Sequence, residues 1–158
     1  MGRRSVQGQT EHRPGMTPSG GAEVGVLLEL RFPAVPESCA RARREVCAAL
    51  DGLGLDLWAV GLAVSEAVTN AVVHAYRDRV GDNDDERFEV RLKVDADGVW
   101  VIVADDGVGM SPRPDSPGLG LGLSVIAQVA DQLLVVQGDT GTRVHMRFGF
   151  VADGADER

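Results

Sequence analysis

The stretch LAVSEAVTNAVVHAYRD, from Leu62 to Asp78, constrains the fold of this chain more than any other. Most of its residues are apolar, which predicts a helix packed into a core. Yet Glu66, Asn70 and His74 stand four residues apart, and residues at this spacing are neighbours on one helix edge. A carboxylate and an amide without partners cost free energy in apolar surroundings. Taken alone, the polar edge fits either a solvent-facing stripe or a ligand site.

Two glycine clusters follow this helix in the sequence. The first, DDGVG at 105–109, comes directly after an expected buried strand, and the second, GLGLGL at 118–123, directly precedes an expected helix. Glycine lets the backbone approach a ligand closely, and a helix N-terminus offers free N–H groups to phosphate. The second cluster is not a Rossmann G-x-G-x-x-G fingerprint, because position 123 is leucine and a proline-rich loop precedes it. Either cluster alone is compatible with a flexible turn.

The composition is that of an ordinary globular protein, with 44% hydrophobic and 25% charged residues among 158. No apolar run approaches the roughly 18 residues that span a bilayer. No apolar segment follows Arg3 and Arg4, so we expect no secretory signal and a cytoplasmic protein. The formal net charge of −8 argues against direct binding of nucleic acid, which needs clustered basic residues.

Lysine and cysteine usage excludes further classes of protein. Lys93 is the only lysine, so the chain has no G-x-x-x-x-G-K-[ST] loop and is not a P-loop nucleotidase. The sequence set of eukaryotic-type protein kinases is also absent. Cys39 and Cys47 would lie roughly 12 Å apart on one helix, beyond the reach of a disulfide. We therefore expect both cysteines to be reduced and structural.

The periodicity of apolar residues predicts a single α+β domain over residues 23–151. Residues 1–22 lack periodicity and form an expected disordered tail, and 152–158 an expected flexible one. Alternation predicts strands at 23–31, 88–94, 99–104, 132–137 and 142–150. Helices are expected at about 37–50, from an N-cap at Asp56 through the opening stretch, and at 124–131. These elements favour a two-layer sandwich of a mostly antiparallel mixed sheet with helices on one face.

Four short boxes occur in order along the chain: Glu66-x-x-x-Asn70, Asp105-x-Gly107-x-Gly109, Gly118-x-Gly120-x-Gly122 and Gly141-Thr142. In this order they resemble the Bergerat ATP-binding fold, which gyrase, histidine kinases and their relatives in the GHKL superfamily share. The segments SEAVTNAVVHAY and GTRVHMRF further resemble the anti-sigma factor serine kinases. The resemblance covers roughly residues 23–151, which is nearly the whole expected domain.

The resemblance implies a role for each box. Asn70 would coordinate the Mg²⁺ that bridges the ATP phosphates, and Glu66 would orient or deprotonate the attacking hydroxyl. Asp105 would accept a hydrogen bond from the adenine amino group, with Thr142 supporting adenine from the neighbouring strand. Two glycines would let the chain pass close to the purine and three would cradle the phosphates: Gly107 and Gly109, then Gly118, Gly120 and Gly122.

The function implied by the resemblance is an anti-sigma regulatory factor. It would bind a sigma factor, and it would use ATP and Mg²⁺ to phosphorylate a serine of an anti-anti-sigma protein. The family also implies a homodimer. The lid expected at 110–117 is short, which weakens the water exclusion and positioning that phosphoryl transfer needs. A non-catalytic ATP-sensing module therefore stays open as an alternative.

Three further alternatives concern single residues and a related class. A cut-down histidine-kinase ATPase domain is less favoured, because no helical hairpin with a phospho-acceptor histidine precedes the expected domain. His74 fits either a contact with phosphate or a structural role. Arg113, in the expected lid, could reach the γ-phosphate through a charge-assisted pair.

Overall fold

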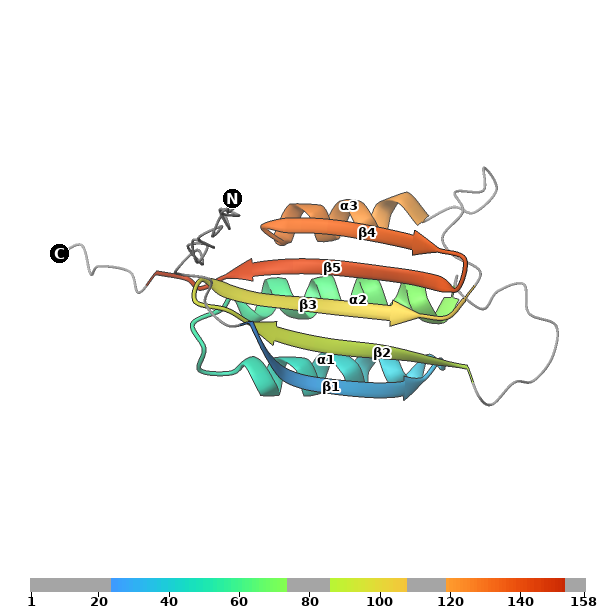
Figure 1. The fold of residues 1–158 in the computed structure, drawn as a ribbon, viewed down its shortest axis with the longest axis horizontal. Coiled ribbons are helices and arrows are strands. Elements are labelled where there is room, and N and C mark those ends of the chain that lie inside the picture. Colours follow the sequence, from blue (N-terminus) through green and yellow to red (C-terminus); the bar gives the residue numbers. More distant parts are fainter. Residues whose placement is uncertain (1–23, 74–85, 108–118, 153–158) are drawn as a thin grey trace, which may run out of the picture.

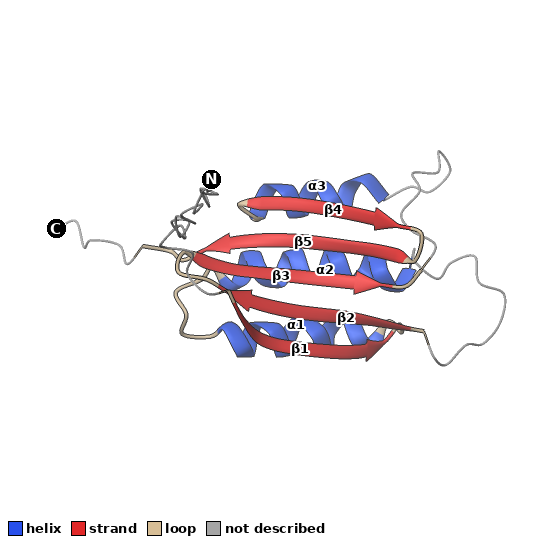
Figure 2. Cartoon of the chain, viewed as in Figure 1, coloured by secondary structure: helices blue, strands red, loops and turns tan. Residues whose placement is uncertain are grey.

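A five-stranded sheet and three helices form two layers in the computed structural model, which describes residues 24–73, 86–107 and 119–152. All three helices cover the same face of the sheet (Figures 1 and 2). The elements, in chain order, are β1 (Gly25–Pro33), α1 (Glu37–Leu50), α2 (Leu57–Val73), β2 (Arg87–Val94), β3 (Gly98–Asp105), α3 (Leu119–Val129), β4 (Gln132–Gly138) and β5 (Gly141–Gly149). The expected α+β fold class is confirmed.

The strands lie in the order β1-β2-β3-β5-β4, and every pairing between described strands is antiparallel. The last strand of the chain is therefore inserted beside β3 rather than added at the edge. This order places the end of β3 next to the start of β5, where Asp105 pairs with Thr142. Two boxes that are far apart in the sequence thus meet where these two inner strands end and begin.

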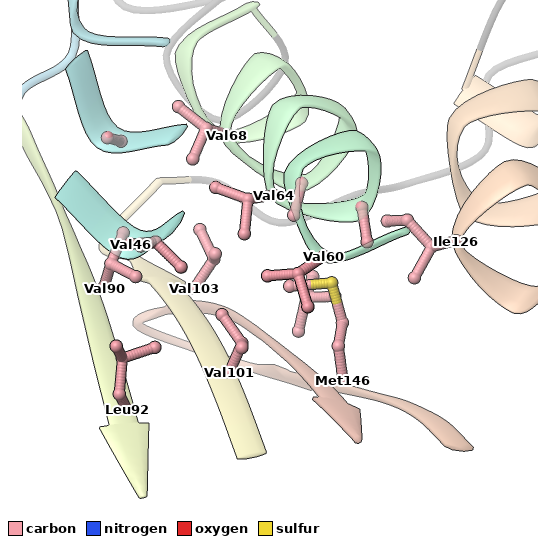
Figure 3. Packing of buried hydrophobic residues seen from close by; sticks show 14 of the residues in the cluster. Val46, Val60, Val64, Val68, Val90, Leu92, Val101, Val103, Ile126 and Met146 are labelled. Atoms are coloured by element: carbon pink, nitrogen blue, oxygen red, sulfur yellow. The ribbon is translucent and has the colours of Figure 1, made fainter. Parts of the chain in front are cut away.

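The core lies between α2 and the centre of the sheet. Val60, Val64 and Val68 recur at i, i+4 and i+8 and are fully buried, and the first two point from α2 toward Val101 and Val103 of β3 (Figure 3). Burying one such side chain contributes about 1.5–3 kcal/mol. Because the helix is fixed by this row, the direction of its remaining side chains is fixed as well.

The start of α2 confirms one expected cap. Asp56 Oδ1 accepts hydrogen bonds from the backbone N–H groups of Trp58 at 3.0 Å and Ala59 at 3.1 Å. An N-cap of this kind contributes about 1 kcal/mol to helix stability. Cys39 and Cys47, which both lie on α1, are free thiols as expected.

Helix α3 begins at Leu119, five residues before the start expected from the sequence. The backbone of Gly120 and Gly122 is therefore helical rather than part of a preceding loop. Glycine costs about 1 kcal/mol in a helix relative to alanine, which is why propensity argued against this start. Packing outweighs that cost, because the helix buries Ile126 completely against the rest of the core.

None of the helices in the described residues is long and apolar enough to cross a membrane. The expected tail at 1–22 and all but the first residue of the tail expected at 152–158 lie outside the described residues, as do His74, the lid at 110–117 with Arg113, and the glycines at 109 and 118. The proposed domain boundaries and the roles of these residues stay predictions.

Gly98, which opens β3, provides a test of this packing. A methyl group built on its Cα would collide with the backbone carbonyl oxygen of Phe148, whereas one built at Gly25 in β1 meets nothing within 4 Å. We expect Gly98→Ala to lower the free energy of unfolding by about 1–3 kcal/mol, the usual cost of overpacking. Urea denaturation measures this, with Gly25→Ala as the matched control. Equal stabilities of the two variants would contradict the close approach of β3 and β5.

Candidate functional site

The polar edge of α2 lies at the boundary of the core. Glu66 is half-buried, and Asn70, one turn later, is only 4% exposed. The Asn70 Nδ2 atom is buried and has no hydrogen-bond partner among the described residues. Leaving a buried polar group unpaired costs about 1–3 kcal/mol, and native structures rarely do so without a ligand, water or functional reason. The edge therefore has the character of a binding site rather than a solvent-facing stripe.

Helix α3 places Gly122, from the third box, beside Glu66 and Asn70 of α2. A methyl group built at Gly122 would lie 3.0 Å from Glu66 Oε2 and 3.3 Å from Asn70 Nδ2. A larger residue would require the ends of these two side chains to shift by a few tenths of an ångström, so the first and third boxes are in close contact. The first residues of α3 also carry backbone N–H groups without intrahelical acceptors, a feature that favours anions such as phosphate.

A second group of predicted residues lies at the end of β3. The Gly107 N–H donates to Asp105 Oδ1 at 2.9 Å. Burial raises the pKa of the Asp105 carboxyl and the neighbouring Asp106 adds to the rise, while the backbone N–H groups of Gly107 and Thr142 act in the opposite direction. The carboxylate is therefore poorly solvated for its charge. A ligand that donates a hydrogen bond to it would recover part of the lost solvation.

Thr142, paired with Asp105 across the strands, is 1% exposed. Its Oγ1 atom, like Asn70 Nδ2, is buried without a hydrogen-bond partner in the described part of the chain. Two polar atoms left unpaired in this way thus belong to residues that the sequence predicted for one site. The missing hydrogen-bond partners of Asn70 and Thr142 are a second sign that these two residues line a site for a polar ligand.

Gly141, the first residue of the fourth box, was given no role of its own in the sequence-based prediction. Its φ is +140°, and a methyl group on it would collide with the backbone carbonyl oxygen of Asp105. The glycine thus lets β5 start directly against the last residue of β3. The signal was present in the Gly141-Thr142 box, but only the threonine was assigned a role.

The two groups lie at the same end of the molecule. The end of α2, the end of β3, the start of β5 and the start of α3 all lie at the right of Figure 1, and α2 packs against both β3 and β5. The described residues of the predicted site therefore lie on these four elements or directly after β3: Glu66, Asn70, Asp105, Gly107, Gly120, Gly122 and Thr142. Their roles toward a ligand stay predictions.

Comparison with known proteins agrees with this geometry. Residues 32–148 match the family described as the histidine kinase-like ATPase domain. The chain is 31% identical over 138 residues to an anti-sigma F factor of Clostridium novyi, a match that covers 78% of this chain and 94% of that protein. It is 30% identical over 138 residues to the serine-protein kinase RsbW of Bacillus pumilus, covering 76% of this chain and 83% of the relative.

Two solved structures share the fold. The RsbU and RsbW domains of a Mycobacterium tuberculosis protein superpose with a TM-score of 0.56 at 20% identity, over 79% of this chain but only 34% of that one. The histidine kinase domain of a blue-light activated histidine kinase from Erythrobacter litoralis gives a TM-score of 0.51 at 27% identity, over 75% of this chain and 62% of the other. With the family match over residues 32–148, the chain belongs to the histidine kinase-like ATPase domain family.

Proposed function

We propose that this protein is an ATP-binding anti-sigma regulatory factor that acts as a serine protein kinase on an anti-anti-sigma partner. The names of its relatives support this proposal. The observation that carries it is the meeting of Asn70, Glu66 and Gly122 at one end of the domain, together with the pairing of half-buried Asp105 with buried Thr142.

Recognition of adenine falls to the end of β3. Asp105 accepts a hydrogen bond from the exocyclic amino group of the base, which its poorly solvated carboxylate favours. The buried hydroxyl of Thr142 lies on the adjacent strand and can pair with a ring nitrogen or a bridging water. A purine with a carbonyl in place of the amino group would face a carboxylate without a donor. This proposal therefore predicts ATP rather than GTP as the nucleotide.

Binding of the phosphates falls to α2 and α3. The side-chain oxygen of Asn70 suits Mg²⁺, a cation that prefers oxygen ligands and keeps several waters and phosphate oxygens in its shell. No group of three or more His, Cys, Asp or Glu side chains in the described residues could hold a metal alone, so the ion would arrive with the nucleotide. When bound, Mg²⁺ neutralises charge on the phosphates. Gly122 leaves space beside Asn70 for this group.

Glu66 is the base in the proposed reaction. A serine hydroxyl of the partner attacks the γ-phosphorus and loses its proton to the Glu66 carboxylate, while the bond from the γ-phosphorus to the bridging oxygen breaks and ADP leaves. One helical turn separates Glu66 from Asn70, so the base and the phosphate-binding residue are held on one rigid element. Positioning of this kind supplies most of the catalysis of phosphoryl transfer.

Asp105→Asn tests recognition of the base. The amide replaces one acceptor oxygen with a donor, so we expect the affinity for ATP to fall by tenfold or more, the cost of about 1–3 kcal/mol for an unmatched buried polar group. Isothermal titration calorimetry with ATP and GTP measures the change. Asp139→Asn, in the exposed turn between β4 and β5, is the control. Unchanged affinity in Asp105→Asn would remove Asp105 from adenine binding.

The same variant has an expected pH signature without nucleotide. Because burial raises the pKa of folded Asp105, the wild type should lose stability relative to Asp105→Asn as the pH rises from the unfolded-state pKa of about 3.9 through the higher folded value. Above that value the difference should stay constant. Denaturant unfolding of both proteins at a series of pH values measures it. A difference that moved in the opposite direction would contradict the desolvation of Asp105.

Glu66→Ala tests the chemistry. We expect transfer of labelled γ-phosphate from ATP to an anti-anti-sigma protein to fall by about 10²–10⁴, with the affinity for ATP retained. The control is Ser65→Ala, because the Ser65 hydroxyl donates to the Gly61 carbonyl within α2. Full transfer by Glu66→Ala would refute its role as base. If wild type binds ATP and labels no partner, a nucleotide-sensing regulator without phosphotransfer replaces the kinase proposal.

A further inference from the structure

The open face of the sheet, opposite the helices, carries a groove that the proposed nucleotide site does not use. Its volume is about 420 Å³, and it lies over β2, β3 and β5. Ile102 and Ala104 of β3 form its floor, because their apolar side chains stand between longer polar ones on both neighbouring strands. The register sets this arrangement: Arg91 and His145 flank Ile102, while Glu89 and Arg143 flank Ala104.

The groove is basic although the chain is acidic. The formal net charge of the protein is −8, yet five basic side chains line this one groove: Arg31, Arg87, Arg91, Lys93 and Arg143. Two carboxylates, Glu89 and Asp106, also line it. An excess of positive charge on an acidic protein therefore faces one channel with an apolar floor.

Glu89 is already engaged by two of these cations. It accepts hydrogen bonds from Arg31 at 3.2 Å and from Arg91 at 2.7 Å. Arg91 also donates to Glu29 at 3.3 Å, while its Nε atom is buried without a hydrogen-bond partner in the described residues. Lys93 and Arg143 form no ion pair within the described part of the chain. The groove thus has positive charge left over that its own carboxylates do not match.

His145 lies among these charges, and the pKa of its imidazole depends on them. Burial lowers the pKa of its imidazole, and the nearby cations Lys93 and Arg143 lower it further. An anion seated in the groove would oppose the effect of those two cations. Its arrival should therefore raise the pKa of His145, which gives a local measure of occupancy.

We propose that this groove binds an acidic, extended segment of a partner protein. Carboxylates of the segment pair with Lys93 and Arg143, the second of which offers a guanidinium group that matches carboxylate geometry well. The methylene groups of the segment lie on Ile102 and Ala104. The site is distinct from the proposed nucleotide site, because it occupies the face of the sheet that the helices leave open (Figure 2).

Charge complementarity favours this occupant over two others. A second copy of the chain, packed by the same face, would set this basic groove against itself, because the contact would be self-complementary. A long nucleic acid would extend beyond the groove onto a surface with a net negative charge, where phosphates are repelled. A short acidic peptide segment meets only the basic channel.

The test uses a short oligo-glutamate peptide as the probe, with the full chain at physiological ionic strength. We expect calorimetric binding to wild type, weakened about tenfold in Lys93→Glu, which changes the charge at this position by two units. Arg44→Glu, an equal charge change at an exposed position on α1, should leave the affinity within about twofold. ATP affinity should stay unchanged in both variants, which separates this test from that of the proposed function.

Two local readouts make the result specific to the groove. Because Lys93 is the only lysine, its amine can be followed by reaction with an acylating reagent, and the peptide should protect it. The pKa of His145, measured by NMR, should rise when the peptide binds to wild type. The proposal is overturned if the peptide does not bind, if Arg44→Glu weakens it as much as Lys93→Glu, if Lys93 stays reactive, or if a single-stranded oligonucleotide binds more tightly.

Discussion

The packing of the α2 valine row on the centre of the sheet is the interaction on which the rest of this structure depends. Val60, Val64 and Val68 are fully buried and hold α2 against β3 and β5 (Figure 3). With that face fixed, Glu66 and Asn70 are directed toward α3, where their side chains lie close to Gly122. A helix free to roll by one residue would turn through about 100° and carry both polar side chains away from the site.

The elements could be predicted from the sequence because their signals are local. Alternating apolar residues marked the strands to within a few residues, and Asp56 marked the start of α2 by the chemistry of its carboxylate. The order of the strands could not be predicted this way, because the insertion of β5 between β3 and β4 is a non-local pairing. The early start of α3 was missed for a related reason: glycine propensity is local, whereas the packing that overrides it comes from α2.

The candidate site was predictable to the extent that its residues form boxes with fixed spacing. Glu66, Asn70, Asp105 and Thr142 were assigned roles from the resemblance, and the fold places them at one end of the domain. The basic groove had no such signal. Its charges alternate along β2 as they would on any strand with one face in water, and only the register across β2, β3 and β5 shows that Arg91, Lys93 and Arg143 share a channel.

The junction of β3 and β5 has a consequence for the whole domain. Successive side chains of a strand point to opposite faces, so buried Thr142 faces the helix layer while its neighbour Arg143 lines the groove on the far side. In the same way, Asp105 is partly buried at the proposed nucleotide site, whereas its neighbour Asp106 lines the groove. A displacement of these strand ends by a ligand on one face moves the residues on the other. Any effect of nucleotide on partner affinity must then be matched by an equal effect of the partner on nucleotide affinity, as linkage requires.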